Sequence, residues 1–291
     1  MEFGLLNMRP YTLTLWLFLV IALLGELWQR SERVISVEDG NGETVSLHIS
    51  RRDARRLELF FRKLIIKDPF AYTLAGSKPI SDTSFRKPLA PFFMVQSPSM
   101  LQGWKIWEKY RIHFENPRFS FWIEENPWVK NQFLVVLADQ YHCNQVVQQH
   151  RQDFEQVLNK SPVNFNDLLH TQPFFQNALL KHDALIGILF GFGRENSWDY
   201  CNPKKHKRLI WSMKKARRLI FRLKSRSRFF RTPQACDMLL PFFVGDPDSE
   251  ESKDLKKTYL AIREKLIRYY EGKEFLEATL SLFMRGPSAL E

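Results

Sequence analysis

The chain has 291 residues, of which 44% are hydrophobic and 14% are aromatic. This composition supplies enough apolar side chains for a substantial core, and it excludes a chain that is disordered as a whole. The three cysteines, Cys143, Cys201 and Cys236, are far apart in sequence, which excludes a C-x-x-C metal or redox motif. We expect three buried thiols in preference to a disulfide.

The formal net charge of +11 at pH 7 comes from one segment. Residues 204–231 contain thirteen Lys and Arg residues and no Asp or Glu. The rest of the chain keeps 30 of the 43 basic residues against 32 acidic ones, a net charge of −2. The basicity is therefore local, and a function that depends on positive charge belongs to this segment.

An apolar stretch at residues 11–28 predicts a membrane segment. It contains fifteen consecutive uncharged residues, 11–25, before Glu26. A spanning helix needs about 20 apolar residues, with a lower limit near 17, and the core of a signal peptide has roughly 7 to 15. We predict that residues 1–30 form a transmembrane anchor or a cleaved signal. The anchor is favoured because Leu23-Leu24-Gly25 is a poor cleavage site.

The charges beside this stretch leave its orientation open. Arg9 and the amino terminus precede it, and Arg30 and Arg33 follow it, so the positive-inside rule does not distinguish the two orientations. A short apolar run at an N-terminus usually acts as an export signal. We expect a single N-terminal span with the body outside the cytoplasm, or an exported protein if the segment is cleaved.

Residues 31–291 are expected to form a single globular domain that is mostly helical. Strands at 34–37 and 43–49 flank the turn sequence Asp39-Gly40-Asn41-Gly42, which predicts a hairpin. Ser50 and Asp53 then form the start of a helix at 51–67. Pro79, Pro88, Pro91 and Pro98 punctuate residues 68–99, which indicates a loop-rich segment with at most a short strand at 92–95.

The second half of the domain alternates strands and helices before it becomes helical. The patterns predict a helix at 100–114, antiparallel strands at 118–124 and 132–138, and a helix at 139–159. A buried helix at 184–192, a long helix that begins at Asp248 or Ser249, and a final helix at 274–284 follow. The predicted fold class is thus α+β, with a transmembrane or signal helix ahead of a domain that contains small antiparallel strand pairs.

The basic segment 204–231 is the strongest functional candidate. Read as a helix, it places Leu209, Met213, Ala216, Ile220 and Leu223 on one seam and cations on the remaining surface. Three partners fit this pattern: anionic lipid headgroups, an acidic protein surface, or a nucleic-acid backbone. Lipid is favoured because the N-terminal stretch points to a membrane. A solvated helix with no specific partner fits equally well.

Ten side chains of this segment are predicted to contact the anionic partner. They are Lys204, Lys205, Lys207, Arg208, Lys214, Lys215, Arg217, Arg218, Arg222 and Lys224.

The sequence Gly191-Phe192-Gly193-Arg194-Glu195-Asn196 offers a second candidate. It lacks the third glycine of a dinucleotide-binding loop and follows an apolar helix where a strand is required. We therefore interpret it as a glycine-rich helix end. The alternative is a polar site built from Arg194, Glu195 and Asn196, which would belong to an unrecognised hydrolase or transferase.

No other motif supports an enzyme. The seven histidines form no H-E-x-x-H pattern, and the sequence contains neither a G-x-S-x-G nor a Walker motif. We expect no metal site and no cofactor, and the sequence leaves enzymatic activity unsupported.

Four stretches of the sequence resemble stretches shared by a group of uncharacterised proteins of chlamydia-related bacteria. They are DPFAYTLAGSKPIS (68–81), GFGRENSW (191–198), LPFFVGDPDSEE (240–251) and YYEGKEFLEATL (269–280). The resemblance implies a bacterial envelope or host-interacting protein of unknown function. It implies no catalytic residues.

Overall fold

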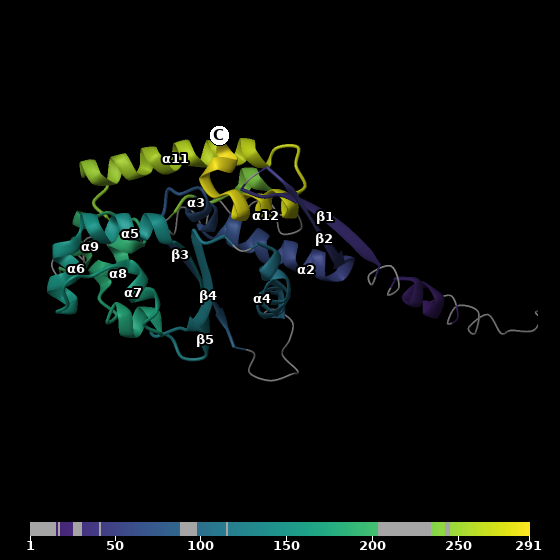
Figure 1. Ribbon diagram of the computed structural model, residues 1–291, viewed down its shortest axis with the longest axis horizontal. Helices are drawn as coiled ribbons and strands as arrows, with labels where there is room; N and C mark the ends of the chain where they lie inside the picture. Colours follow the sequence, from purple (N-terminus) through teal and green to yellow (C-terminus); the bar gives the residue numbers. More distant parts are fainter. Residues whose placement is uncertain are drawn as a thin grey trace, which may run out of the picture.

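A three-stranded antiparallel sheet lies at the centre of the protein, with helices on both faces (Figure 1). The structure is a computed structural model that describes residues 16, 18–25, 31–40, 42–87, 98–114, 116–202, 234–241 and 245–291. The strands are β3 (Ile80–Arg86), β4 (Phe119–Glu125) and β5 (Gln132–Asp139), in the order β3-β5-β4. Val135 of β5 pairs with Thr83 of β3 and Ile123 of β4.

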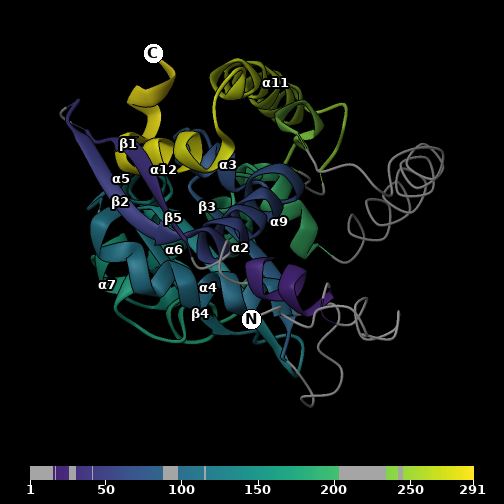
Figure 2. The same ribbon diagram turned by 90° about the vertical axis from the view of Figure 1, so that its right-hand side faces the viewer.

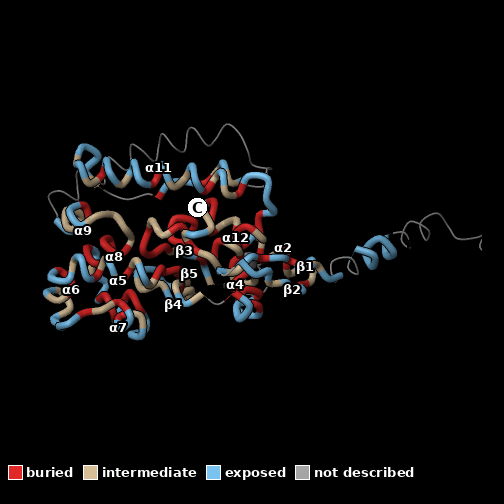
Figure 3. The backbone as a smooth tube through the Cα atoms, turned by 45° about the horizontal axis from the view of Figure 1, so that its top comes forward, coloured by how far each residue is buried: buried red, intermediate tan, exposed pale blue. Residues whose placement is uncertain are grey.

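Alternate side chains of β5 enter two different hydrophobic cores. Val135 and Leu137 face one core, and Leu134, Val136 and Ala138 face the other. Because successive side chains of a strand point to opposite faces, one strand serves both cores. Figure 3 shows the resulting line of buried backbone through the middle of the molecule.

The first core lies between the sheet and the N- and C-terminal elements of the domain. A hairpin of β1 (Glu32–Glu38) and β2 (Thr44–Ser50) buries Ile35, Val37, Leu47 and Ile49 there. The helical elements of this layer are α2 (Arg51–Arg62), η1 (Lys63–Lys67), α3 (Phe70–Leu74), α4 (Pro98–Tyr110), η3 (Arg111–Phe114), α12 (Phe275–Arg285) and η6 (Gly286–Leu290).

The second core lies on the other face of the sheet, under a layer of short helices. They are α5 (Gln140–Gln149), α6 (Arg151–Leu158), α7 (Phe165–Leu169), η4 (Phe174–Ala178), α8 (Asp183–Leu189) and α9 (Arg194–Cys201). The predicted helix at 139–159 is two helices, because the chain breaks between α5 and α6 at His150. Asp139 accepts a hydrogen bond from the His142 amide at 3.2 Å and begins α5, as predicted.

The 21-residue helix α11 (Glu250–Tyr270) extends along both layers (Figures 1 and 2). Its N-cap is Ser249, which accepts a hydrogen bond from the Ser252 amide at 3.2 Å, in agreement with the predicted start. Tyr259 lies near the middle of α11, where its ring centroid is 5.6 Å from that of Tyr72 and its hydroxyl donates to the Gly191 carbonyl at 2.9 Å.

Several predicted elements are confirmed, and one strand was missed. The hairpin, the helix after Ser50, the helix at 100–114 and the strands β4 and β5 agree with the prediction. The prediction of a loop-rich segment at 68–99 is wrong for α3 and β3. The β3 sequence Ser81-Asp82-Thr83-Ser84 is too polar to show an apolar alternation, and it becomes a strand because β5 supplies its hydrogen bonds. The proposed strand at 92–95 lies outside the described residues.

The predicted membrane segment requires a correction. Within the described part of the chain, no helix is both long enough and apolar enough to cross a bilayer. The described residues 18–25 of this stretch are helical and exposed. The transmembrane or signal helix in the predicted fold class, and the location as a single-span membrane protein, are therefore not supported.

Replacing Gly103 by Ala should destabilise the protein. A Cβ built on Gly103 of α4 would lie 2.4 Å from the Cβ of Phe60 on α2. Alanine usually stabilises a helix interior by about 1 kcal/mol over glycine, but overpacking costs about 1–3 kcal/mol. We expect a net loss of about 1–2 kcal/mol in the free energy of unfolding, measured by urea denaturation.

The matched control is Gly40→Ala in the hairpin turn, where a Cβ meets nothing within 4 Å. This variant should change the free energy of unfolding by no more than about 0.5 kcal/mol. A Gly103→Ala variant as stable as the control would contradict the close packing of α2 on α4.

Candidate functional site

The ten predicted binding residues between Lys204 and Lys224 lie outside the described residues. The structure shows the two flanks of the basic segment. The upstream flank is α9, which is followed by Asn202, and the chain is described again from Gln234, just before η5 (Ala235–Asp237). The geometry of these flanks defines how the segment is attached to the domain.

The upstream flank is attached to α11 by a carboxylate. Glu251 accepts hydrogen bonds from the backbone amides of Glu195 at 3.2 Å and Asn196 at 2.9 Å. These amides belong to the first turn of α9, where N–H groups have no partner within the helix and negative charge is stabilising. Gly193 makes the approach possible: its φ is +87°, and a Cβ there would lie 2.2 Å from Cδ of Glu251.

The candidate polar site at Arg194, Glu195 and Asn196 lies at this contact between α9 and α11. Arg194 donates to both carboxylate oxygens of Asp153 on α6, at 2.6 and 2.8 Å, and this pairing lowers the pKa of Asp153. Asn196 is 3% exposed, donates to the Phe192 carbonyl and accepts from the Ser252 hydroxyl at 3.2 Å. Because these groups bond to the protein itself, their arrangement is that of a structural contact between α6, α9 and α11.

The downstream flank is attached to the same helix by an arginine. Arg263 of α11 donates to the carbonyl oxygens of Cys236 at 2.9 Å and Met238 at 2.8 Å. The Leu239 amide donates to the Ile66 carbonyl at 3.0 Å, which ties this flank to η1 as well. Hydrogen bonds from a charged donor are stronger than neutral ones, so η5 has a defined position on α11.

The described elements before and after the basic segment, α9 and η5, therefore both contact α11. Glu251 and Arg263 are twelve residues apart, which corresponds to about 18 Å along the helix axis. Sequence patterns give no indication of this arrangement, because the two anchoring residues lie 20 or more positions beyond the basic segment.

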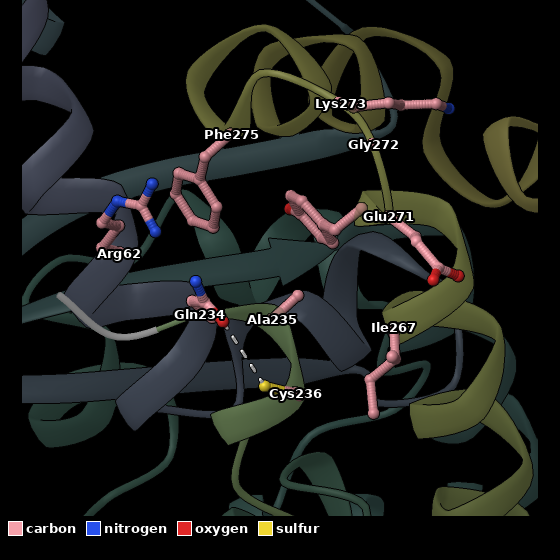
Figure 4. Close-up of a pocket in the computed structure, with 10 residues that line it drawn as sticks. Arg62, Gln234, Ala235, Cys236, Ile267, Glu271, Gly272, Lys273 and Phe275 are labelled. Carbon is pink, nitrogen blue, oxygen red and sulfur yellow. Dashed lines mark hydrogen bonds between the residues drawn. The ribbon is translucent and has the colours of Figure 1, made fainter. Parts of the chain in front are cut away.

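A pocket of about 400 Å³ lies beside the downstream flank (Figure 4). One wall contains the rings of Tyr270 and Phe275, which stack with centroids 5.2 Å apart, and the Arg62 guanidinium lies 4.2 Å from the Phe275 centroid. The lining residues are Arg62, Gln234, Ala235, Cys236, Ile267, Tyr270, Glu271, Gly272, Lys273 and Phe275. No sequence motif marks the pocket, since its walls come from α2, η5, α11 and α12.

The thiols differ from the prediction of three buried cysteines. Cys143 is buried and its thiol donates to the Pro79 carbonyl at 3.4 Å, whereas Cys201 and Cys236 are exposed. All three are free, and Cys236 faces the pocket.

Lys78 is the most unusual buried charge in the domain. It is 2% exposed, its Nζ donates to the Ile80 carbonyl, and the rings of Phe190 and Phe192 lie 4.7 and 5.3 Å from Nζ. Burial lowers the pKa of Lys78 to about 7, although the attraction of Asp82 opposes this shift. Its neighbours thus enclose the amine within the protein.

Among the described residues, no group of three or more His, Cys, Asp or Glu side chains is placed to hold a metal ion. Comparison with protein-family models, with curated proteins and with solved structures finds no match to this chain. The resemblance to proteins of chlamydia-related bacteria therefore stays a prediction.

Replacing Lys78 by Met should remove a pH dependence of stability above pH 7. The folded pKa of about 7 is below the ordinary value of 10.5, so between these pH values the unfolded chain binds a proton that the folded chain does not. Stability of the wild type should therefore rise with pH in this window, relative to Lys78→Met, by up to about 1.4 kcal/mol per pH unit. Below pH 7 the variant should be the more stable protein, because no ammonium is buried.

This prediction is checked by urea denaturation of both proteins at several pH values from 6 to 9. Taking the difference between them cancels the titration of groups that Lys78 does not influence, whereas the pKa of Asp82, which the Lys78 charge lowers, changes with the substitution. A difference that does not change with pH would contradict a lowered pKa for Lys78.

Replacing Glu251 by Gln should loosen α9 specifically. The variant keeps the shape of the side chain but loses the charge-assisted bonds to the amides of Glu195 and Asn196. We expect these amides to exchange with solvent deuterium faster and the free energy of unfolding to fall by about 1–2 kcal/mol. Arg263→Gln should have the corresponding effect on η5 and leave α9 unchanged.

Lys257→Gln is the control, since this side chain is exposed on the same helix. Hydrogen exchange measured by mass spectrometry distinguishes the three variants. Equal exchange in α9 for Glu251→Gln and the control would show that Glu251 does not hold this flank.

Proposed function

We propose that this protein is a non-enzymatic binding protein that holds an anionic partner through residues 204–231. The observation that carries the proposal is the attachment of both flanks of this segment to one helix, by Glu251 at α9 and by Arg263 at η5. Attachment at both ends limits the positions that the segment can take relative to the domain. The entropy lost when a partner binds is reduced accordingly.

The distribution of charge supports an anionic partner. Thirteen cations occur in 28 residues with no acidic residue, in a chain that is otherwise slightly acidic. Like charges at this density repel each other, and a partner that neutralises them relieves the repulsion. Anionic lipid headgroups are the first partner to test, because each Lys or Arg near an anionic bilayer surface contributes about 1 kcal/mol to binding. Contact with headgroups requires no spanning helix.

The proposed binding is tested by replacing Lys214, Lys215, Arg217 and Arg218 with Gln. We expect co-sedimentation with vesicles that contain phosphatidylserine, at low salt, to weaken by at least about tenfold. Raising the salt concentration should weaken the binding of the wild type as well. Binding to single-stranded RNA and duplex DNA is measured in parallel.

The matched control replaces four exposed lysines of α11, Lys253, Lys256, Lys257 and Lys265, with Gln. This control removes the same charge from another surface and should retain most of the binding. If the wild type binds RNA or DNA through 204–231 and does not bind vesicles, the partner is a nucleic acid. If the segment variant binds every probe as the wild type does, the proposed function is wrong.

A further inference from the structure

A second basic surface lies within the described part of the chain, on α2 and α4. Its cations are Arg51, Arg52, Arg55, Arg56, Lys105, Lys109 and Arg111, all exposed except for the partly exposed Arg56. We call these seven residues the α2–α4 basic face. The acidic side chains of the same elements are Asp53, Glu58 and Glu108, of which Asp53 lies 3.5 Å from Lys109 and Glu58 accepts from Arg62 at 2.7 Å. The surface thus has a net positive charge.

The packing of α2 on α4 places the two sets of cations next to each other. Phe60 of α2 meets Gly103 of α4, and Asp53 lies beside Lys109, so the two helices are antiparallel. The first two turns of α2 therefore lie along the last two turns of α4. Figures 1 and 2 show the two helices side by side at this edge of the domain.

The arginines of α2 lie at the end of the helix that disfavours them. Four of the first six residues of α2 are Arg, and Asp53 is the only acidic residue in its first turn. The helix dipole gives an N-terminus a partial positive charge, and a cation placed there costs typically about 0.3–1 kcal/mol.

Two exposed apolar side chains interrupt the basic face. Leu59 is 49% exposed and follows Arg52, Arg55 and Arg56 at spacings of seven, four and three, which places it on their side of α2. Ile112 is 70% exposed and follows Arg111 directly. Cations around isolated aliphatic side chains are typical of proteins that lie on a bilayer surface.

The aromatic residues of α4 argue against nucleic acid as the partner. Surfaces that bind single strands commonly present exposed aromatic rings for stacking on bases. Trp104, Trp107 and Tyr110 are instead only 4%, 2% and 8% exposed and belong to the first core. On these two helices the exposed apolar groups are aliphatic.

We propose that the α2–α4 basic face binds the headgroup region of an anionic lipid bilayer, with Leu59 and Ile112 inserted between the headgroups. This contact is separate from the basic segment 204–231 and uses residues from the opposite half of the sequence.

The test replaces Arg52, Arg55, Arg56 and Lys105 with Gln, which keeps helix propensity and removes four charges. Binding is measured by co-sedimentation with vesicles of phosphatidylcholine that contain about one-quarter phosphatidylserine, at low salt. We expect at least about a tenfold loss of binding. The melting temperature should rise, because the cations leave the N-terminus of α2. Weaker binding by a more stable protein separates this result from a loss caused by misfolding.

The α11 variant with Lys253, Lys256, Lys257 and Lys265 replaced by Gln is again the control for net charge. It should bind vesicles within about threefold of the wild type. A second variant combines Leu59→Ser with Ile112→Ser. It should weaken the part of the vesicle binding that persists at high salt, where charge is screened.

Unchanged vesicle binding by the four-charge variant would overturn the proposal. So would binding of single-stranded RNA through this face by a protein that does not bind vesicles. The segment variant of the preceding section keeps the two proposals distinguishable. If that variant binds normally while the α2–α4 variant does not, the proposed role of 204–231 fails and the lipid-binding face stands.

Discussion

The fold depends on β5, the central strand that serves two hydrophobic cores at once. Val135, Val136 and Ala138 are fully buried, and Leu137 is 1% exposed. Full burial of an aliphatic side chain contributes roughly 1.5–3 kcal/mol, so this one strand concentrates a large part of the stabilising burial. The hydrogen bonds of β5 also convert the polar sequence of β3 into a strand. Each helical layer therefore has its position because it covers one face of β5.

Polar contacts then attach the long helix α11 across both layers. Glu251 binds the first turn of α9 on the second core, Arg263 binds η5, and Tyr259 donates to Gly191 between them. In these three contacts a charged or hydroxyl side chain bonds to backbone atoms. Such bonds fix the position of α11 more precisely than apolar contact does. As a result, the described elements on either side of the basic segment contact α11 at points about 18 Å apart along its axis.

The distribution of charge connects this architecture to function. One set of cations is concentrated in 204–231, and another lies on α2 and α4, while most of the remaining charges of the described surface are mixed in sign. Like charges in the first set repel each other, and the arginines of the second lie at the end of α2 where the helix dipole disfavours cations. Both are consistent with a protein whose role is to hold an anionic surface. Of the residues that the sequence offered as a polar site, Arg194 binds Asp153 of α6 and Asn196 accepts from Ser252 of α11.

The sequence by itself determined the local elements and the location of the charge. Period-two alternation identified β2 and β4, and the turn sequence at 39–42 located β1. The capping residues Ser50 and Asp248 or Ser249 located two helix starts, and composition located the basic segment. Each of these signals is carried by neighbouring residues. Only the tertiary structure decided that the polar segment before Lys87 is a strand. It also decided that Glu251 and Arg263 hold the two flanks of 204–231, and that the cations of α2 lie next to those of α4. These features join residues from 25 to 58 positions apart, and no local pattern records which distant side chains will meet. Composition alone misled the prediction for the apolar N-terminal stretch. It suggested a span, but among the described residues no helix is both long enough and apolar enough to cross a bilayer.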